Sequence, residues 1–537
     1  MTETITGGEA ARAALEALGV ECVFGIPSQH NLALYEALSR SNQIRTVGAR
    51  NEAGAVHAAD GYARATGKLG VAIVSTGPGT SNAVTGLYEA GYASSPVMLI
   101  TTQVDRPYLD QCRGYIHDAP GQLAMLQSVT RRTERPLHAQ DIAPAILRLA
   151  GDILSGRPQP GAIEIPTDLL KEPTPVVHLT APAIAVDTPK AAAIEAAAAL
   201  IAKARRPLIW LGGGCVRSGA EDAVRAFVDH IGAPVVTTVN GRSAIPSDHP
   251  LVVGSSTHYP QARPLFEDAD LVIAVGTRFQ AVATGFWTMP IDCPLIQIDI
   301  DASLIGRNYP VTTAIVGDAG VSLEALRRAA SAPRVDPEYG AAARDIVDAI
   351  KAESAKRIGP DHVRLCDALD AVLPTDRIVV SDATMVGNTW ASFRLPVRDF
   401  RGYTYSTSLA IGPALPLAIG AAIGSGRRTI AVHGDGGVML NIGELATAVE
   451  ARAPMTLLVF NNQGYGVLKL LQGMQGLTPF ACDLHTPDFV GLGKAMGMPA
   501  ERVDTVEGFE AALRRSIAID GPSLIEVDIS GMAPVGL

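Results

Sequence analysis

The sequence predicts an α/β protein built from three doubly wound parallel-sheet domains. A chain of 537 residues has room for about three domains of ordinary size. Its residues are 47% hydrophobic but only 5% aromatic, which is typical of layered α/β proteins. Short apolar runs that end in glycine turns alternate with helix-like runs, as parallel strands joined by helical crossovers do.

The first domain is expected over residues 1–172. A helix-like run at residues 8–18 precedes a strand at residues 21–25, and short strands then alternate with helices to about Leu170. Several prolines follow in residues 172–189, which predicts an interdomain linker there.

The second and third domains are expected over residues 190–330 and 350–537. Buried parallel strands are predicted at residues 207–211 and 271–276, because both runs are apolar and end in glycine. This pattern makes the central domain Rossmann-like. The proline-containing residues 332–337 separate it from the third domain.

Composition excludes several classes of function. The net charge of −10 leaves no basic surface for nucleic acid or an anionic membrane. Six cysteines without CxxC spacing argue against a disulfide framework or a zinc site and fit a reducing cytoplasm. The N-terminus carries no signal-peptide pattern, and no apolar run reaches about 18 residues. We therefore expect a soluble, cytoplasmic protein without a nucleic-acid or membrane partner.

Two turns in the third domain are the most informative motifs. Residues 434–437 (GDGG) follow a predicted strand, and residues 461–464 (NNQG) follow the next one. A right-handed crossover makes these strands parallel, so Asp435 and Asn462 are expected at one edge of the sheet. Their oxygens suit Mg²⁺, and the glycines let a diphosphate approach the backbone. Taken singly, each turn is also explained as an ordinary strand-to-helix connection.

Together the two turns resemble the thiamine diphosphate signature of 2-oxo acid decarboxylases and acetolactate synthases. Asn462 stands 27 positions after Asp435. The resemblance implies that Asp435, Asn462 and the carbonyl of Gly464 bind the Mg²⁺ that anchors the diphosphate of thiamine diphosphate. It covers nearly the whole chain and implies a pyrimidine-binding first domain, a central domain and a diphosphate-binding third domain.

Glu52 is the expected catalytic residue. It stands near the start of a helix predicted over residues 50–68, whose small residues form a face that another backbone can approach closely. From the residues alone, a first-turn glutamate is explained by the helix dipole. The resemblance implies that Glu52 reaches the N1′ atom of the cofactor's aminopyrimidine. A carboxyl group in a dry interface has a raised pKa, which suits proton exchange with that nitrogen.

The resemblance implies further cofactor contacts. Ile411 is expected to force the two cofactor rings together, and the carbonyl of Leu409 is expected to accept from the 4′-amino group. The other expected contacts are Gly77 and Asn82 in the first domain and Asp382, Asn388, Gly434, Gly436, Gly437 and Tyr465 in the third.

Two histidines are expected at the substrate end. His30 follows a strand-to-helix loop similar to the one that carries a catalytic histidine in benzaldehyde lyase. The loop patterns around His30 and His117 also resemble guanidino-oxopentanoate decarboxylases. Either histidine is suited to relay protons near neutral pH, although a lone loop histidine is often only solvated. Gln122, Leu468 and Leu471 are expected to line the substrate pocket.

The sequence departs from acetolactate synthases at two places. Leu471 stands where those enzymes carry a tryptophan that selects the acceptor, and an apolar residue replaces their FAD-binding arginine in the segment 278–285. The sequence therefore does not favour FAD or acetolactate synthesis proper. The central domain also lacks a CoA or ADP signature.

The expected function is a thiamine diphosphate- and Mg²⁺-dependent lyase or carboligase acting on 2-oxo acids or 2-hydroxyketones. Acetolactate synthase proper remains an alternative. From other classes, a nicotinamide-dependent dehydrogenase would use residues 212–214, which lack GxGxxG spacing, and a non-catalytic regulatory subunit would not need Glu52. Because Glu52 and Asp435 lie in different domains, the resemblance implies a homodimer or homotetramer with active sites between subunits.

Overall fold

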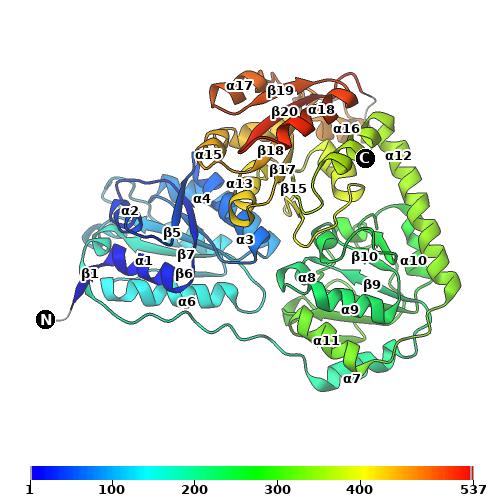
Figure 1. Ribbon diagram of the computed structural model, residues 1–537. Helices are drawn as coiled ribbons and strands as arrows, with labels where there is room; N and C mark the ends of the chain where they lie inside the picture. The colour runs from blue at the N-terminus through cyan, green and yellow to red at the C-terminus, as the bar shows by residue number, and fades with distance from the viewer. Residues whose placement is uncertain (1–2, 533–534, 536–537) are drawn as a thin grey trace.

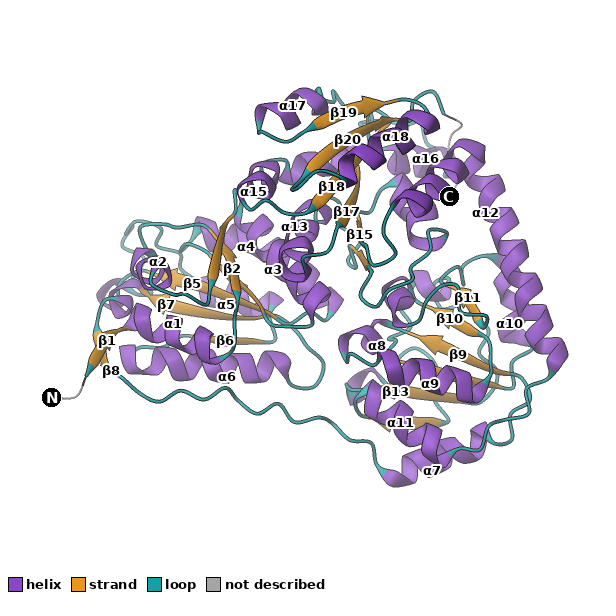
Figure 2. Cartoon of the chain, in the orientation of Figure 1, coloured by secondary structure: helices purple, strands orange, loops and turns teal. Residues whose placement is uncertain are grey.

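The computed structural model describes residues 3–532 and residue 535, which form three six-stranded sheets flanked by helices (Figures 1 and 2). Every strand pair within these sheets is parallel. The predicted fold class, three doubly wound α/β domains, is therefore confirmed.

The first sheet has the strand order β3-β2-β4-β5-β7-β6. Its seven-residue strand β5 is buried along its whole length, because helices cover both faces of the sheet. The strands are β2 (Cys22–Gly25), β3 (Arg45–Gly48), β4 (Gly70–Ile73), β5 (Val97–Gln103), β6 (Arg132–Glu134) and β7 (Gly161–Pro166). The helices are α1 (Gly7–Ala17), α2 (Leu32–Ser39), α3 (Glu52–Thr66), α4 (Pro78–Ala93), α5 (Gln122–Val129) and α6 (Ile142–Leu154).

A short antiparallel ribbon closes the first domain. It pairs β1 (Thr4–Thr6) with β8 (Pro173–Pro175), which lies at the start of the expected linker. The chain then runs as an extended segment to the central domain (Figure 1).

The central sheet has the order β11-β10-β9-β12-β13-β14. Its strands are β9 (Pro207–Leu211), β10 (Val235–Thr237), β11 (Val252–Gly254), β12 (Leu271–Val275), β13 (Leu295–Asp299) and β14 (Thr313–Val316). Its helices are α7 (Ala191–Ile201), α8 (Gly213–Arg217), α9 (Glu221–Ile231), α10 (Arg263–Glu267) and α11 (Ala319–Ala329).

The long helix α12 (Pro337–Val372) connects the central and third domains (Figure 1). Asp336 caps its start by accepting from the Glu338 backbone N–H. A kink at Gly359, whose φ is 79°, precedes Pro360. The expected third-domain start at residue 350 therefore falls within this helix.

The third sheet has the order β16-β15-β17-β18-β20-β19. Its strands are β15 (Ile378–Ser381), β16 (Tyr403–Tyr405), β17 (Thr429–Gly434), β18 (Met455–Asn461), β19 (Ala500–Val503) and β20 (Ser523–Asp528). Its helices are α13 (Ala414–Ser425), α14 (Asp435–Val438), α15 (Glu444–Glu450), α16 (Gly466–Met474), α17 (Phe489–Ala495) and α18 (Val506–Ile517). As expected, β17 and β18 are neighbours in parallel register.

Helices α3 and α13 join the first and third domains through backbone contacts. A Cβ atom at Gly61 would lie 1.9 Å from the carbonyl oxygen of Leu417, and one at Gly420 would lie 1.8 Å from that of Ala58. Only glycine permits this approach. The small-residue face expected on α3 therefore packs against α13.

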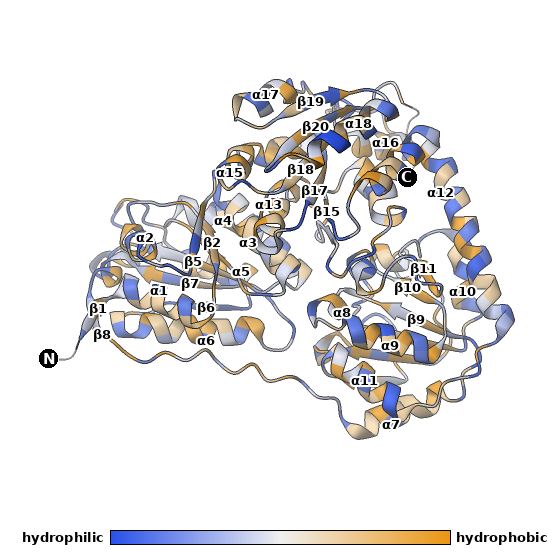
Figure 3. Cartoon of the chain, viewed as in Figure 1, coloured by the Kyte–Doolittle hydropathy of each residue, from blue (hydrophilic) through white to orange (hydrophobic). Residues whose placement is uncertain are grey.

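Surface helices such as α9 and α12 carry hydrophilic and hydrophobic residues side by side (Figure 3). In the part of the chain that the structure describes, no helix combines the length and the apolar character needed to cross a bilayer.

Candidate active site

Asp435 and Asn462 lie together at the carboxyl edge of the third sheet, where β17 and β18 end. One terminal atom of the Asn462 amide lies 3.3 Å from Oδ1 of Asp435 and 3.1 Å from the carbonyl oxygen of Gly464. When that atom is the amide oxygen, three oxygens converge with no proton between them, which is the arrangement that a Mg²⁺ ion requires. Oδ2 of Asp435 is buried without a hydrogen-bond partner among the described residues. Burial raises the pKa of Asp435, and a bound cation would restore its charged form.

A cavity of about 220 Å³ opens beside these oxygens. Its described lining belongs entirely to the third domain and contains no first-domain residue. The lining includes Asp382, Asn388, Leu409, Ile411, Gly434, Asp435, Gly436, Gly437, Asn462, Gly464, Tyr465 and Leu468.

The glycine turn after β17 is closely covered by its neighbours. A Cβ atom at Gly436 would lie 2.6 Å from the Tyr465 ring, and one at Gly437 would lie 2.6 Å from Oδ2 of Asp382. Both oxygens of Asp382 accept from the Gly412 backbone N–H, at 3.0 and 2.8 Å. Asp382 therefore also ties the glycine turn to the loop that precedes α13.

The loop before α13 carries Leu409 and Ile411, whose side chains are exposed in the cavity. Leu409 has a φ of 64°, a left-handed conformation that is uncommon for leucine and that is often found at functional sites. Behind this loop, Oδ1 of Asn388 accepts from the Tyr405 hydroxyl.

Glu52 lies at the edge of the first domain, as the first residue of α3. The Asn82 amide donates to Oε2 of Glu52 at 3.0 Å. A Cβ atom at Gly79 would lie 3.1 Å from Oε1 of Glu52, so the start of α4 also borders this carboxylate. The structure thus brings Glu52 and Asn82 together, but apart from the cavity of the third domain in the same chain.

Gln122 supports the turn at Gly77. Its Oε1 accepts from the Gly77 backbone N–H at 2.7 Å, while its Nε2 donates to the Thr102 carbonyl at 2.9 Å and to Glu164 at 2.7 Å. The Gln122 side chain is buried, and its amide is used within the first domain. Gly77 has a φ of 61°, and a Cβ atom there would lie 2.7 Å from the carbonyl oxygen of His117.

His30 and His117 form a ring pair with centroids 5.1 Å apart. His30 is only 3% exposed, and neither of its ring nitrogens has a hydrogen-bond partner among the described residues. Burial and the neighbouring His117 lower the pKa of His30. The pair borders the Gly77 turn on the same side of the first domain as Glu52.

Helix α16 presents an exposed apolar surface beside the cavity. Leu468 lines the cavity, whereas Leu471 lies outside its lining. Leu468, Leu471 and Met474 are all exposed in the single chain.

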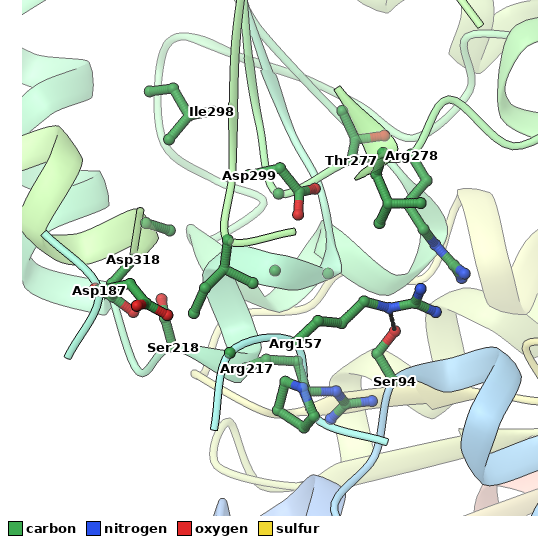
Figure 4. Close-up of a pocket in the computed structure, with 18 of the residues that line it drawn as sticks. Ser94, Arg157, Asp187, Arg217, Ser218, Thr277, Arg278, Ile298, Asp299 and Asp318 are labelled. Carbon is green, nitrogen blue, oxygen red and sulfur yellow. Dashed lines mark hydrogen bonds between the residues drawn. The ribbon is translucent and has the colours of Figure 1, made fainter. Parts of the chain in front are cut away.

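A second cavity of about 250 Å³ lies between the first and central domains (Figure 4). Arg157, Arg217 and Arg278 line one wall, and Nε of Arg157 donates to Ser94 at 2.8 Å. Burial lowers the pKa of Arg217 to about 9 and that of Arg278 to about 10. Burial also raises the pKa of Asp299, at the end of β13, to about 6. A ligand here would contact three arginine side chains, away from the cavity beside Asp435 and Asn462.

Sequence reasoning missed two buried glutamates, Glu89 on α4 and Glu444 on α15, that join the first and third domains. Their contacts span more than 300 residues of sequence. Neither residue stands in a motif, so the sequence offers no local signal for them.

Comparison with known proteins assigns the domains. Residues 5–125 match the thiamine pyrophosphate enzyme N-terminal TPP binding domain. Residues 194–326 match the thiamine pyrophosphate enzyme central domain. Residues 382–527 match the thiamine pyrophosphate enzyme C-terminal TPP binding domain.

Full-length relatives agree with these domain matches. A probable 2-ketoarginine decarboxylase of Pseudomonas aeruginosa is 35% identical, over 98% of this chain and 94% of the relative. The acetolactate synthase large subunit of Corynebacterium glutamicum is 30% identical, over 99% and 88% of the two chains. A probable acetolactate synthase large subunit of Methanocaldococcus jannaschii is 31% identical, over 97% and 92%. The chain therefore belongs to the thiamine pyrophosphate enzyme family and is a thiamine diphosphate-dependent enzyme that forms or cleaves a carbon–carbon bond next to a carbonyl.

Proposed function

We propose that the enzyme uses Mg²⁺ with thiamine diphosphate and decarboxylates a 2-oxo acid whose side chain ends in a guanidinium group. The observation that carries this substrate class is the full-length similarity to a probable 2-ketoarginine decarboxylase. Leu471, in place of the acceptor-selecting tryptophan expected in acetolactate synthases, supports release of an aldehyde over transfer to a second 2-oxo acid. The scattered cysteines support a cytoplasmic location.

The residues of the third domain fit a metal-bound diphosphate. Asp435 and Asn462 would supply side-chain oxygens to Mg²⁺, and Gly464 would supply its carbonyl. The unpartnered Oδ2 of Asp435 supports this role. Gly436 and Gly437 leave their backbone free of side chains where the diphosphate oxygens would approach.

When bound, thiamine diphosphate supplies an electron sink for the electron pair left by departing CO₂. Glu52 would give a proton to N1′ of the pyrimidine, while Asn82 holds the Glu52 carboxylate in place. The Leu409 carbonyl would accept from the 4′-amino group, and Ile411 would keep the two rings close. His30 and His117 would exchange a proton with the substrate's carbonyl oxygen, and Leu468 would exclude water.

The proposal includes a homodimer or homotetramer with active sites between subunits. The cavity lined by the third domain contains no first-domain residue in the described chain. Within one chain, Glu52 begins α3, whereas Arg64 near its other end donates to the Tyr405 carbonyl. Tyr405 directly precedes residues 406–413, the loop before α13 that we call the cofactor loop. Twelve helical residues separate these ends by about 18 Å. Glu52 therefore suits a cofactor held by a second copy.

Turnover with 5-guanidino-2-oxopentanoate tests the proposal. Purified protein with thiamine diphosphate and MgCl₂ should release CO₂ and the corresponding aldehyde, and the Glu52→Gln variant should not. Pyruvate is the matched comparison, because an acetolactate synthase would convert it to acetolactate. Acetolactate from pyruvate with no CO₂ from the guanidino acid would refute the proposed substrate class.

A further inference from the structure

Two buried carboxylates cross the contact between the first and third domains of one chain. Glu444 and Glu89 are each 1% exposed. A buried carboxylate needs hydrogen-bond donors or a cation to offset the loss of water. Each of these two glutamates obtains backbone N–H donors from the domain to which it does not belong.

Glu444 holds the residues immediately before Glu52. Its Oε1 accepts from the backbone N–H groups of Arg50 at 3.0 Å and Asn51 at 2.9 Å. Gly54 makes this approach possible, because a Cβ atom there would lie 2.3 Å from the same oxygen. Asn51 in turn caps α3 by accepting from the Ala53 backbone N–H. The first turn of α3, and with it the Glu52 backbone, is thus fixed from the third domain.

Glu89 makes the reciprocal contact with the cofactor loop. Its Oε1 accepts from the Thr407 backbone N–H at 2.7 Å, and its Oε2 accepts from the Ser408 backbone N–H at 2.9 Å and from the Ser408 hydroxyl. The next residue is Leu409, which has the left-handed backbone. At the far end of the loop, Gly412 donates to Asp382. The segment with Leu409 and Ile411 is therefore held at both ends.

The hydrogen-bond donors of Glu89 explain why it depends on the loop. The buried Arg64 pairs with both Asp60 and Glu89. Arg217 adds a second buried positive charge near Asp60 and Glu89, but Arg64 and the N–H groups of Thr407 and Ser408 supply the hydrogen bonds to Glu89. Displacing the loop would leave buried acceptors without donors, which is unfavourable.

We propose that Glu444 and Glu89 are positioning residues for the thiamine-dependent reaction. Glu444 fixes the position of the Glu52 backbone at the edge of the first domain. Glu89 fixes the positions of the Leu409 carbonyl and the Ile411 side chain. This inference rests on the proposed function, because it uses the roles proposed there for Glu52, Leu409 and Ile411. In the proposed dimer, Glu52 serves the cofactor bound by the partner, whereas Leu409 and Ile411 serve the cofactor bound by their own chain. Each chain therefore positions one half of each of the two sites.

The hydrogen-bond pattern predicts different responses to substitution. In Glu444→Gln, the amide oxygen keeps both backbone donors, and Nε2 donates to Thr447 Oγ1, which itself donates to the Gly48 carbonyl. Glu444→Ala loses these acceptors. Glu89→Gln cannot keep all its contacts, because both oxygens of Glu89 face donors. If the two glutamates acted only through their negative charge, Glu444→Gln and Glu89→Gln would instead have similar effects on activity.

The test uses the reconstituted holoenzyme of Glu444→Gln, Glu444→Ala and Glu89→Gln. Glu450→Gln is the matched control, because Glu450 ends the same helix and pairs with the exposed Arg50 side chain in the same domain contact. We measure kcat, the thiamine diphosphate Kd, the melting temperature, and the exchange of the cofactor C2 proton with deuterium in the absence of substrate.

Glu444→Ala and Glu89→Gln should lower kcat and C2 exchange by about 10- to 100-fold, the effect of a small misplacement of reacting groups. Their cofactor Kd should change less than kcat, since neither glutamate lines the cavity that contains Asp435 and Asn462. Glu444→Gln and Glu450→Gln should match the wild type. If the C2 proton exchanges at the wild-type rate in Glu89→Gln, the inference is overturned, even if Glu444→Ala does not fold. A loss of exchange only in proportion to lost folded protein also overturns it.

The Glu52→Gln variant separates this inference from the proposed function. If wild-type protein turns over and Glu52→Gln does not, but Glu444→Ala and Glu89→Gln exchange normally, only the positioning inference fails. If Glu52→Gln keeps wild-type turnover, the proposed catalytic role fails first.

Discussion

The contact between α3 and α13 makes a sharp prediction about Gly420. In Gly420→Ala, the new Cβ would lie 1.8 Å from the Ala58 carbonyl oxygen and 2.9 Å from the Tyr62 backbone nitrogen. Ordinary contact requires the helices to separate by about 1.5 Å or more. Alanine contributes about 1 kcal/mol of helix propensity, but overpacking of this severity costs about 3 kcal/mol. The net effect should be a destabilisation of about 2 kcal/mol.

Thermal unfolding of the holoenzyme measures this effect against a matched control. Gly340 also lies inside a helix, α12, but a Cβ atom there would meet nothing within 4 Å. Gly340→Ala should therefore stabilise the chain by up to about 1 kcal/mol. Gly420→Ala should melt about 4–8 °C lower than wild type, with lower kcat, because α3 begins at Glu52. If the melting temperature of Gly420→Ala equals that of Gly340→Ala, the packing argument is refuted.

Three further predictions concern the metal, the pH dependence and the assembly. Asp435→Asn should lose Mg²⁺-dependent thiamine diphosphate binding in titration calorimetry, while its melting temperature without cofactor stays near that of wild type. Burial lowers the pKa of His362 to about 4, so the unfolded chain gains a proton below about pH 6.5 that the folded chain does not. The contribution of His362 to stability should thus be complete above about pH 6.5 and smaller by about 2 kcal/mol at pH 5. Urea unfolding of His362→Gln should show a weaker pH dependence than wild type by about that amount. Mixing the inactive Glu52→Gln and Asp435→Asn proteins should restore up to about a quarter of wild-type activity through mixed dimers with one intact site. No recovery after subunit exchange would contradict shared sites.

Local patterns were sufficient to predict the fold class and the placement of the two turns that we propose to bind the metal. The runs that end at Gly434 and Asn461 are short, apolar and followed by glycine or asparagine, and they form the neighbouring strands β17 and β18. The helix expected over residues 50–68 is α3, which ends one residue before Gly67, whose φ is 76°. Such signals lie within about ten residues of sequence.

Contacts between distant segments were not predictable in the same way. The loop pattern predicts that Gln122 lines the substrate pocket, but it does not reveal the contacts of its amide with Gly77, Thr102 and Glu164. In the sequence, nothing distinguishes Glu444 from other helical glutamates. Its role is visible only in the fold, where the start of α3 lies beside it. The three-dimensional arrangement of domains determines these partners, and a single sequence contains no periodicity that reports it.

Helix α3 explains why the two halves of the proposed active sites depend on each other. Its first residue is Glu52, and Arg64 near its last turn holds the Tyr405 carbonyl and Glu89 beside the cofactor loop. The middle of the helix, at Ala58 and Gly61, is packed backbone to backbone against α13, so a shift of the helix against α13 would move both ends. In the proposed dimer the first end serves the partner's cofactor and the second end serves the chain's own. The separation of the two reaction centres is therefore set by a rigid helix and its glycine contacts, and loosening that contact should impair both sites together.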